Sequence, residues 1–232
     1  ELHGKGIYQR VMELAQIAHP KFREEIINEA KKRHYIFPDQ LPPTKQDLIF
    51  LENYKYHLVL PNRRTVEFRP LLPSDEFASR NFFYSLQETT VYYRFFQKRK
   101  VFSREMLQKQ WASVDYRKNM TIIGLLPKRQ HKEIVAIGSY AKSEESESVA
   151  EVAFVVKEEF QDQGIGFFLL QILETIAKEN GYQAFTATVL SENIKMVHVF
   201  KKRYPQAKTR RGIGGEVEIF MPFDQSAGSE SD

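Results

Sequence analysis

The stretch that decides the fold is residues 149–180, VAEVAFVVKEEFQDQGIGFFLLQILETIAKEN. Its first part alternates and then becomes apolar, which predicts a strand over 151–156. Its last part has apolar residues at three-to-four spacing, which predicts an amphipathic helix over 164–180 that Gly181 ends. The sequence therefore predicts a glycine-containing turn between a strand and a long helix.

This turn has the properties of a phosphate-binding site. A helix N-terminus exposes unpaired N–H groups and partial positive charge, which suits a pyrophosphate. Glycine lets the backbone approach a ligand because no side chain stands in the way. A Rossmann turn would need a third glycine where Leu169 stands, and a P-loop would need Gly-Lys-Ser/Thr where Phe167 follows Gly166. Both alternatives fail.

The rest of the chain mixes strand and helix patterns. Strands are predicted at 56–60, 66–69, 121–126, 134–140 and 185–189, with a final hairpin of 207–211 and 216–221. Helices are predicted over 74–83, where Ser74 or Asp75 could act as the cap, and over 103–112 and 193–203. Residues 1–36 predict two helical segments, interrupted where Pro20 restricts His19. We expect a helical N-terminal extension and linker at 1–62, a main domain at 63–224 and a disordered tail at 225–232.

Composition excludes several classes of function. The 232 residues carry a net charge of +4 and contain no cysteine, so disulfides, cysteine metal sites and cysteine nucleophiles are excluded. The six histidines show no ligand spacing, so no metal site is predicted. The basic clusters lack interleaved stacking aromatics, so no nucleic-acid partner is expected. No apolar run approaches the ~20 residues of a membrane span. No signal segment follows Glu1, so we expect a cytoplasmic protein, part of a longer chain.

The pattern Gln161-x-x-Gly164-x-Gly166 resembles the acyl-CoA signature of the GNAT superfamily of N-acetyltransferases. The resemblance implies an α/β (α+β) fold with a mixed, mostly antiparallel central sheet, flanked by helices and splayed to admit CoA. It also implies acetyl-CoA as co-substrate and a set of cofactor-binding residues. These are Phe154, Val155 and Val156 for pantetheine, Gln161, Asp162, Gln163, Gly164, Ile165, Gly166 and Phe167 around the pyrophosphate, and Asn193. Asp162 departs from the family pattern, and we expect its carboxylate to point outward.

A more specific resemblance covers residues 64–223. Among other matching segments, Arg69-Pro70, Tyr93-Arg94-Phe95-Phe96 and Val114-Asp115-Tyr116 are similar to the GNAT domain of bacterial protein lysine acetyltransferases, which modify acyl-CoA synthetases. This implies direct transfer of an acetyl or other short acyl group to a protein lysine, with Glu151 as general base. The family's tyrosine acid is replaced by Phe200. Either Tyr204 substitutes for it, or the thiolate leaves unassisted.

Residues 1–36 resemble the C-terminal end of acetyl-CoA hydrolases and CoA-transferases, which implies a fusion with a CoA-transferase-like domain. A helical appendage of the acyltransferase explains the segment equally well. Two other functions stay open. One is acetylation of a small-molecule amine, and the other is a non-catalytic domain that senses acyl-CoA and regulates an attached domain.

Overall fold

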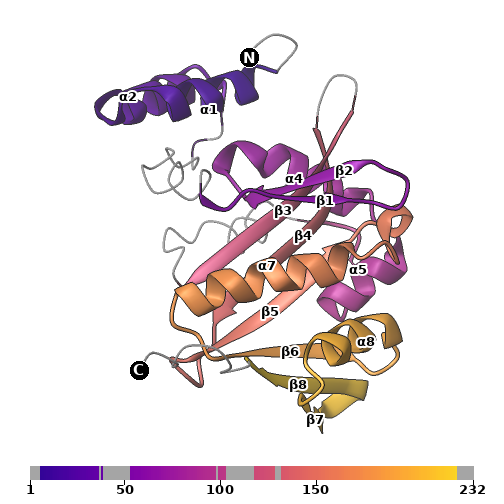
Figure 1. Ribbon diagram of the computed structural model, residues 1–232. Coiled ribbons are helices and arrows are strands. Elements are labelled where there is room, and N and C mark those ends of the chain that lie inside the picture. Colours follow the sequence, from indigo (N-terminus) through magenta and orange to yellow (C-terminus); the bar gives the residue numbers. More distant parts are fainter. Residues whose placement is uncertain are drawn as a thin grey trace. The chain divides into compact units, whose positions relative to one another are not determined.

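In the computed structural model, placement is described for residues 6–36, 38, 53–97, 99–102, 118–128 and 132–223. The chain forms two compact units. Unit 1 comprises Glu1–Ser85, Phe102–Ala112 and Ile123–Val135, and unit 2 comprises Leu86–Val101, Ser113–Ile122 and Ala136–Asp232. The strands form an eight-stranded sheet in the order β1-β2-β3-β4-β5-β6-β8-β7 (Figure 1). The expected mixed α/β fold is confirmed.

Two helices begin the described part of unit 1, α1 (Ile7–Ile17) and α2 (Pro20–Lys32). Pro20 occupies the first turn of α2, where its missing N–H is no loss, and this explains the predicted break. The two helices share a small apolar core of Met12, Ala15, Ile27, Ala30 and Ile36. The boundary near residue 62 stays a prediction, and the tail at 225–232 lies outside the described residues.

A hairpin and a helix follow in unit 1. Strands β1 (Tyr56–Val59) and β2 (Thr65–Pro70) pair antiparallel, and α4 spans Glu76–Tyr84. Asp75 stands at the N-cap position but makes no side-chain cap bond. Its Oδ2 and Oδ1 instead accept from the Arg69 Nη1 and Nη2 atoms at 2.6 and 2.9 Å. Asp75, one of the two predicted candidates, is therefore the N-cap residue by position, but its carboxylate binds the partly buried Arg69 guanidinium instead of a helix N–H.

The strands at the centre and end of the chain match the predicted segments. They are β3 (Asn119–Pro127), β4 (Lys132–Lys142), β5 (Val149–Val156), β6 (Ala184–Leu190), β7 (Lys208–Arg211) and β8 (Glu216–Pro222). Antiparallel pairs join β4 to β5, β6 to β8 and β7 to β8, whereas β5 and β6 are parallel. The predicted helix over 103–112 lies outside the described residues.

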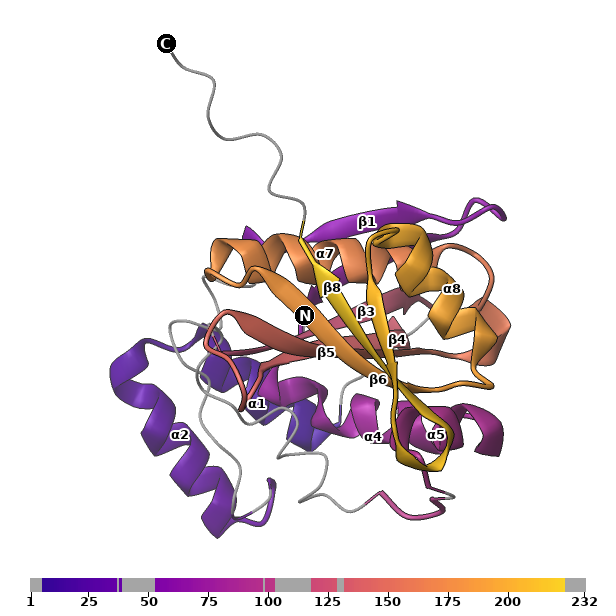
Figure 2. The same ribbon diagram turned by 90° about the horizontal axis from the view of Figure 1, so that it is seen from below.

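Three helices of unit 2 surround the parallel pair, α5 (Glu88–Phe95), α7 (Ile165–Glu179) and α8 (Ile194–Arg203). Both α5 and α7 pack on β5, and they lie on opposite faces of it (Figure 2). The chain leaves α7 through Gly181, whose φ of 89° fits the predicted stop. Helix α5 was not predicted, because its sequence ETTVYYRF is rich in β-branched and aromatic residues that favour strands.

The long helix α7 supplies much of the core of unit 2. Leu169 and Leu173 are fully buried, and a Cβ at Gly138 of β4 would lie only 2.7 Å from Leu169 Cδ2. Gly138 is therefore required for α7 to lie close to the sheet. Across the described ranges, no helix is both long and apolar enough to span a bilayer.

Candidate active site

The sheet of unit 2 opens between β5 and β6. These strands pair at only three positions, Val149 with Ala184, Ala150 with Phe185, and Glu151 with Thr186. On its other side β5 stays paired with β4 as far as Val156. The two parallel strands therefore diverge after Glu151, and this fork leaves one backbone edge of residues 152–156 without a pairing partner in β6. The expected opening of the sheet is present here.

A pocket of about 890 Å³ occupies this fork and is lined by α5, β5, the turn at 158–167, β6 and α8. It brings together most of the predicted site residues, namely Glu151, Phe154, Val155, Val156, Gln161, Asp162, Gly164, Gly166, Phe167 and Asn193. Gln163 and Ile165 are not in the lining. Gln163 donates its side-chain amide to the Glu159 carbonyl at 3.0 Å, and Ile165 is buried in the core. A binding role for these two residues stays a prediction that concerns their backbone.

The two glycines of the turn serve different purposes. Gly164 is the N-cap of α7 with φ 83°, and a Cβ there would meet nothing within 4 Å. Glycine is thus needed for the left-handed backbone, and the space beside it is open to a ligand. Gly166 lies against the sheet, because a Cβ there would approach Phe154 Cε2 to 3.1 Å. An open space at the start of a 15-residue helix fits a pyrophosphate.

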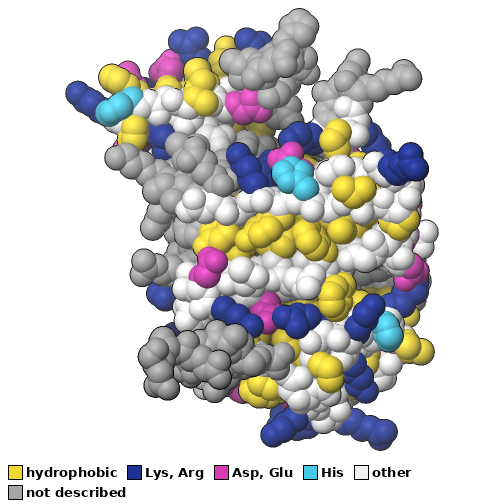
Figure 3. Space-filling model, in the orientation of Figure 1, with side chains coloured by type: hydrophobic (Ala, Val, Ile, Leu, Met, Phe, Trp, Pro, Cys, Tyr) yellow, Lys and Arg dark blue, Asp and Glu magenta, His cyan; other side chains and the backbone are white. Residues whose placement is uncertain are grey.

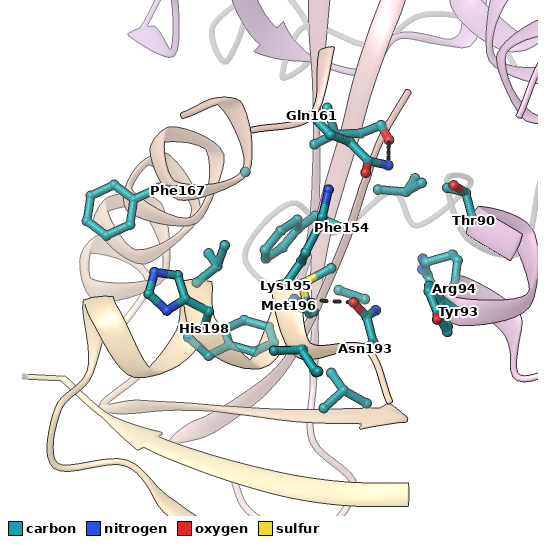
Figure 4. A pocket seen from close by; sticks show the side chains of 18 of the residues that line it. Thr90, Tyr93, Arg94, Phe154, Gln161, Phe167, Asn193, Lys195, Met196 and His198 are labelled. Atoms are coloured by element: carbon teal, nitrogen blue, oxygen red, sulfur yellow. Dashed lines mark hydrogen bonds between the residues drawn. The ribbon is translucent and has the colours of Figure 1, made fainter. Parts of the chain in front are cut away.

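Two amide side chains fix the backbone on either side of the fork. Gln161 Nε2 donates to the Val156 carbonyl at 3.0 Å and so ties the turn to the end of β5 (Figure 4). Asn193 Oδ1 accepts from Met196 N at 3.2 Å and caps α8, which follows β6. One amide therefore holds the β5 side of the opening and the other holds the β6 side.

The turn carries an acidic residue, Asp162, which is among the residues of the pocket lining and whose side chain is 71% exposed. Its Oδ2 lies 2.6 Å from Lys195 Nζ on α8, so its charge is compensated. Lys202, also in the lining, has its ammonium 5.5 Å from the centre of the Phe167 ring. Lys and Arg side chains gather over α8 and β7 (Figure 3), so this end of unit 2 favours an anionic ligand.

Strand parity decides which face each β5 side chain occupies. Gly138 of β4 and Phe154 of β5 are partners in the register, and the side-chain direction at both positions is toward α7. Because neighbouring side chains alternate, Glu151 points to the opposite face, where α5 packs. Arg94 of α5 also lines the pocket, and the two charges interact. Burial lowers the pKa of the Arg94 guanidinium, and the Glu151 carboxylate acts in the opposite direction.

Phe200 and Tyr204 both lie in the core of unit 2. Phe200 is buried, and its ring stands edge-on to Phe154 with centroids 5.5 Å apart. Tyr204 is also buried and outside the pocket lining, and its hydroxyl donates to Glu174 Oε2 at 2.9 Å. Tyr204 is therefore not placed to protonate a thiolate in this pocket.

Sequence reasoning missed Thr90 and Arg94, which face the pocket from α5 beside Tyr93 (Figure 4). The only signal was a single cation inside the aromatic run from Tyr92 to Phe96. As for metals, the described residues contain no group of three or more His, Asp or Glu side chains that could hold an ion.

A glycine-containing turn suited to phosphate, beside a forked, mixed sheet, fits the class of N-acyltransferases that take their acyl group from CoA. The profile of the acetyltransferase (GNAT) family matches residues 83–204, and the chain belongs to this family.

Relatives and solved structures agree with this membership. The chain is 31% identical over 128 residues to acetyltransferase Pat of Mycolicibacterium smegmatis, covering 55% of this chain and 37% of that protein. It thus spans little more than a third of that relative. The GNAT domain of Streptomyces lividans PAT matches with a TM-score of 0.64 at 24% identity, over 73% of this chain and 97% of that one. The yncA protein of Salmonella typhimurium, solved with its cofactor acetyl-CoA, shares the fold at TM-score 0.53 and 13% identity, over 72% of this chain and 98% of that one.

Proposed function

We propose that unit 2 transfers an acetyl group from acetyl-CoA to the side-chain amine of a protein lysine, with Glu151 as general base. The observation that carries this proposal is the fork, because Glu151 is the last β5 residue paired with β6. Its carboxylate therefore lies at the point where the sheet opens, on the face away from the helix that would hold the phosphates. The named relative Pat, an acetyltransferase, supports the choice of reaction.

The roles of the residues follow from their places. The amides at the start of α7 and the open space beside Gly164 would hold the pyrophosphate. The free backbone edge of residues 152–156 would hold pantetheine by hydrogen bonds. Acetyl-CoA, when bound, supplies a thioester whose C–S bond breaks as the amine nitrogen bonds to the acetyl carbon. A lysine ammonium has no lone pair with which to attack, so Glu151 takes one of its protons, and the sulfur of CoA leaves as the thiolate.

The test follows the release of free thiol from acetyl-CoA, with and without a lysine-bearing protein such as an acyl-CoA synthetase whose cysteines are blocked. The chain has no cysteine of its own to disturb the assay. We expect thiol release only when the acceptor is present. Glu151→Gln should lower the rate by about 10²–10⁴-fold while acetyl-CoA still binds.

The matched control is Glu147→Gln, which removes an exposed carboxylate paired with Lys142 outside the pocket lining. It should leave the rate unchanged. If the acetyl group is transferred to small amines but to no protein, the acceptor is a small-molecule amine instead of a protein lysine. Tight acetyl-CoA binding with no thiol release across proteins and amines would support a sensor instead of an enzyme. A Glu151→Gln variant as fast as the wild type would remove Glu151 from the mechanism.

A further inference from the structure

Arg94 is a cation on the α5 wall of the pocket, on the face that Glu151 also occupies. Its side chain extends from α5 beside Thr90 and Tyr93 (Figure 4). Because α5 packs against both β5 and β6, Arg94 is held over the fork itself. The guanidinium therefore belongs to the half of the pocket through which an acceptor would reach Glu151.

Within the described residues, no hydrogen bond or ion pair engages the Arg94 guanidinium. Its contacts are the ring of Phe95, 5.2 Å from Cζ, and a Coulombic interaction with Glu151. A guanidinium stays charged and offers five N–H donors, and removing it from water without acceptors costs free energy. Such a group in a pocket wall is suited to an anionic oxygen pair on a ligand, which it can bind in a bidentate manner.

The phosphates of CoA are not that anion. Their expected place is the N-terminus of α7, which packs on the opposite face of β5. Lys195 and Lys202 of α8 line the pocket and supply positive charge for the phosphates. An anion at Arg94 must therefore belong to the acceptor or to the acyl group.

We propose that Arg94 binds a carboxylate that the acceptor carries close to the amine to be acetylated. A carboxylate and a cation that line the same pocket and interact electrostatically complement a ligand with an amine and a carboxylate, since Glu151 receives the amine and Arg94 the carboxylate. In a protein acceptor the carboxylate comes from an Asp or Glu beside the lysine. The α-carboxylate of a free amino acid has the same chemistry. This proposal rests on the proposed function and names its acceptor class.

The experiment uses blocked peptides with a single acceptor lysine, flanked on both sides by Glu, by Gln or by Arg. Wild-type kcat/KM should favour the Glu peptide over the Gln peptide by about tenfold or more, as expected for a charged hydrogen-bonded pair. Arg94→Gln should abolish the preference, and Arg94→Lys should keep part of it. Arg94→Glu should reverse it, so that the Arg-flanked peptide becomes the best substrate.

The control is Arg10→Glu, which makes the same charge change at an exposed residue of α1, outside the pocket lining. It should keep the wild-type preference. Melting temperature and acetyl-CoA affinity of each Arg94 variant show that folding and the cofactor site survive. If free amino acids are acetylated with the same dependence on Arg94, the carboxylate site is supported and its ligand is the α-carboxylate of a free amino acid.

Three results would overturn the proposal. Wild-type protein could treat the Glu and Gln peptides alike. The Arg94 variants could lower kcat equally for all peptides, which would mean that Arg94 acts on Glu151. Succinyl-CoA could be preferred over acetyl-CoA in an Arg94-dependent way, which would place the anion in the acyl group. If no peptide is acetylated, the proposed function fails, and calorimetric binding of the same peptides decides on Arg94 by itself.

Discussion

Gly164 meets two requirements of the turn, a left-handed backbone and an open space beside it. Its φ of 83° is one that side chains rarely adopt, and the space around it is empty to 4 Å. A side chain there would not collide with the protein. It would instead strain the turn and fill the space that a pyrophosphate needs. Gly181, at the other end of α7, has the same handedness at φ 89° and the same empty surroundings.

We therefore predict that Gly164→Val weakens acetyl-CoA binding at least tenfold, as measured by calorimetry, because the β-branched side chain blocks the backbone amides. Gly181→Val is the matched control. Both variants should lose stability by roughly 1–3 kcal/mol from backbone strain. Only the variant at Gly164 should lose the ligand, and equal affinity in both would exclude this turn as the phosphate site.

At the scale of elements, the arms of the fork are joined by a buried carboxylate. Glu174 of α7, only 3% exposed, lies 2.7 Å from Arg203 Nη2 and accepts from the Tyr204 hydroxyl at 2.9 Å. Lys178 Nζ approaches its other oxygen to 2.7 Å. Because α7 follows β5 and α8 follows β6, this cluster ties together the two strands that diverge at the pocket.

Glu174→Ala should lower the free energy of unfolding by about 3 kcal/mol, the lower end for a broken buried pair, since the partly exposed cations keep some water. Denaturant titration measures this loss. Thr175→Ala, one residue on and exposed, removes only a bond to the Gln171 carbonyl of its own helix and should cost less than about 0.5 kcal/mol. Similar losses in both variants would mean that the cluster does not stabilise unit 2.

A second prediction at this scale concerns Glu67 of β2, whose Oε2 accepts from Lys132 Nζ at 2.7 Å. Burial raises the pKa of Glu67, but the hydrogen bond and charge of Lys132 outweigh it, so the net pKa lies below the usual value. A carboxyl with a lowered folded-state pKa contributes stability above its unfolded-state pKa and loses it on acidification.

Stability measured by urea titration should therefore fall between about pH 5 and 3, and less steeply in Glu67→Gln. Glu24→Gln, an exposed substitution on α2, should keep the wild-type slope. A Glu67→Gln profile that runs parallel to the wild type would show that this ion pair contributes nothing to the pH dependence.

For the whole molecule, binding at the fork predicts where the chain will be protected. Saturating acetyl-CoA at about 100 times its Kd should add roughly 2.7 kcal/mol by mass action and raise the melting temperature. Hydrogen–deuterium exchange should slow most in residues 152–156 and 162–168, which line or follow the pocket. Exchange in α1 and α2, outside the lining, should change least, and Gly164→Val should remove the local effect. Strongest protection in α1 and α2 would place the ligand elsewhere.

Several secondary-structure elements of this protein could be predicted from local sequence patterns. Alternation and apolar spacing predicted β5, α7 and the hairpin of β7 and β8, because the periods of strand and helix are written into neighbouring residues. The glycine turn predicted a phosphate site for the same reason, since its chemistry lies within six residues. The composition of α5 favours a strand, but packing against β5 and β6 overrides the weak preference of eight residues.

Tertiary structure alone decided what depends on residues far apart in the chain. The end of β5–β6 pairing at Glu151 is a property of two strands, and no pattern in either one sets it. Arg94 reaches the pocket because α5 packs over the fork, whereas in sequence it is one cation among aromatics. The carboxylate of Asp162 is compensated by Lys195, 33 positions later in the chain, which no local pattern predicts. Local sequence patterns therefore determined most of the helices and strands. Packing determined which residues meet at the site, because charge and backbone pairing act between residues that are far apart in the chain.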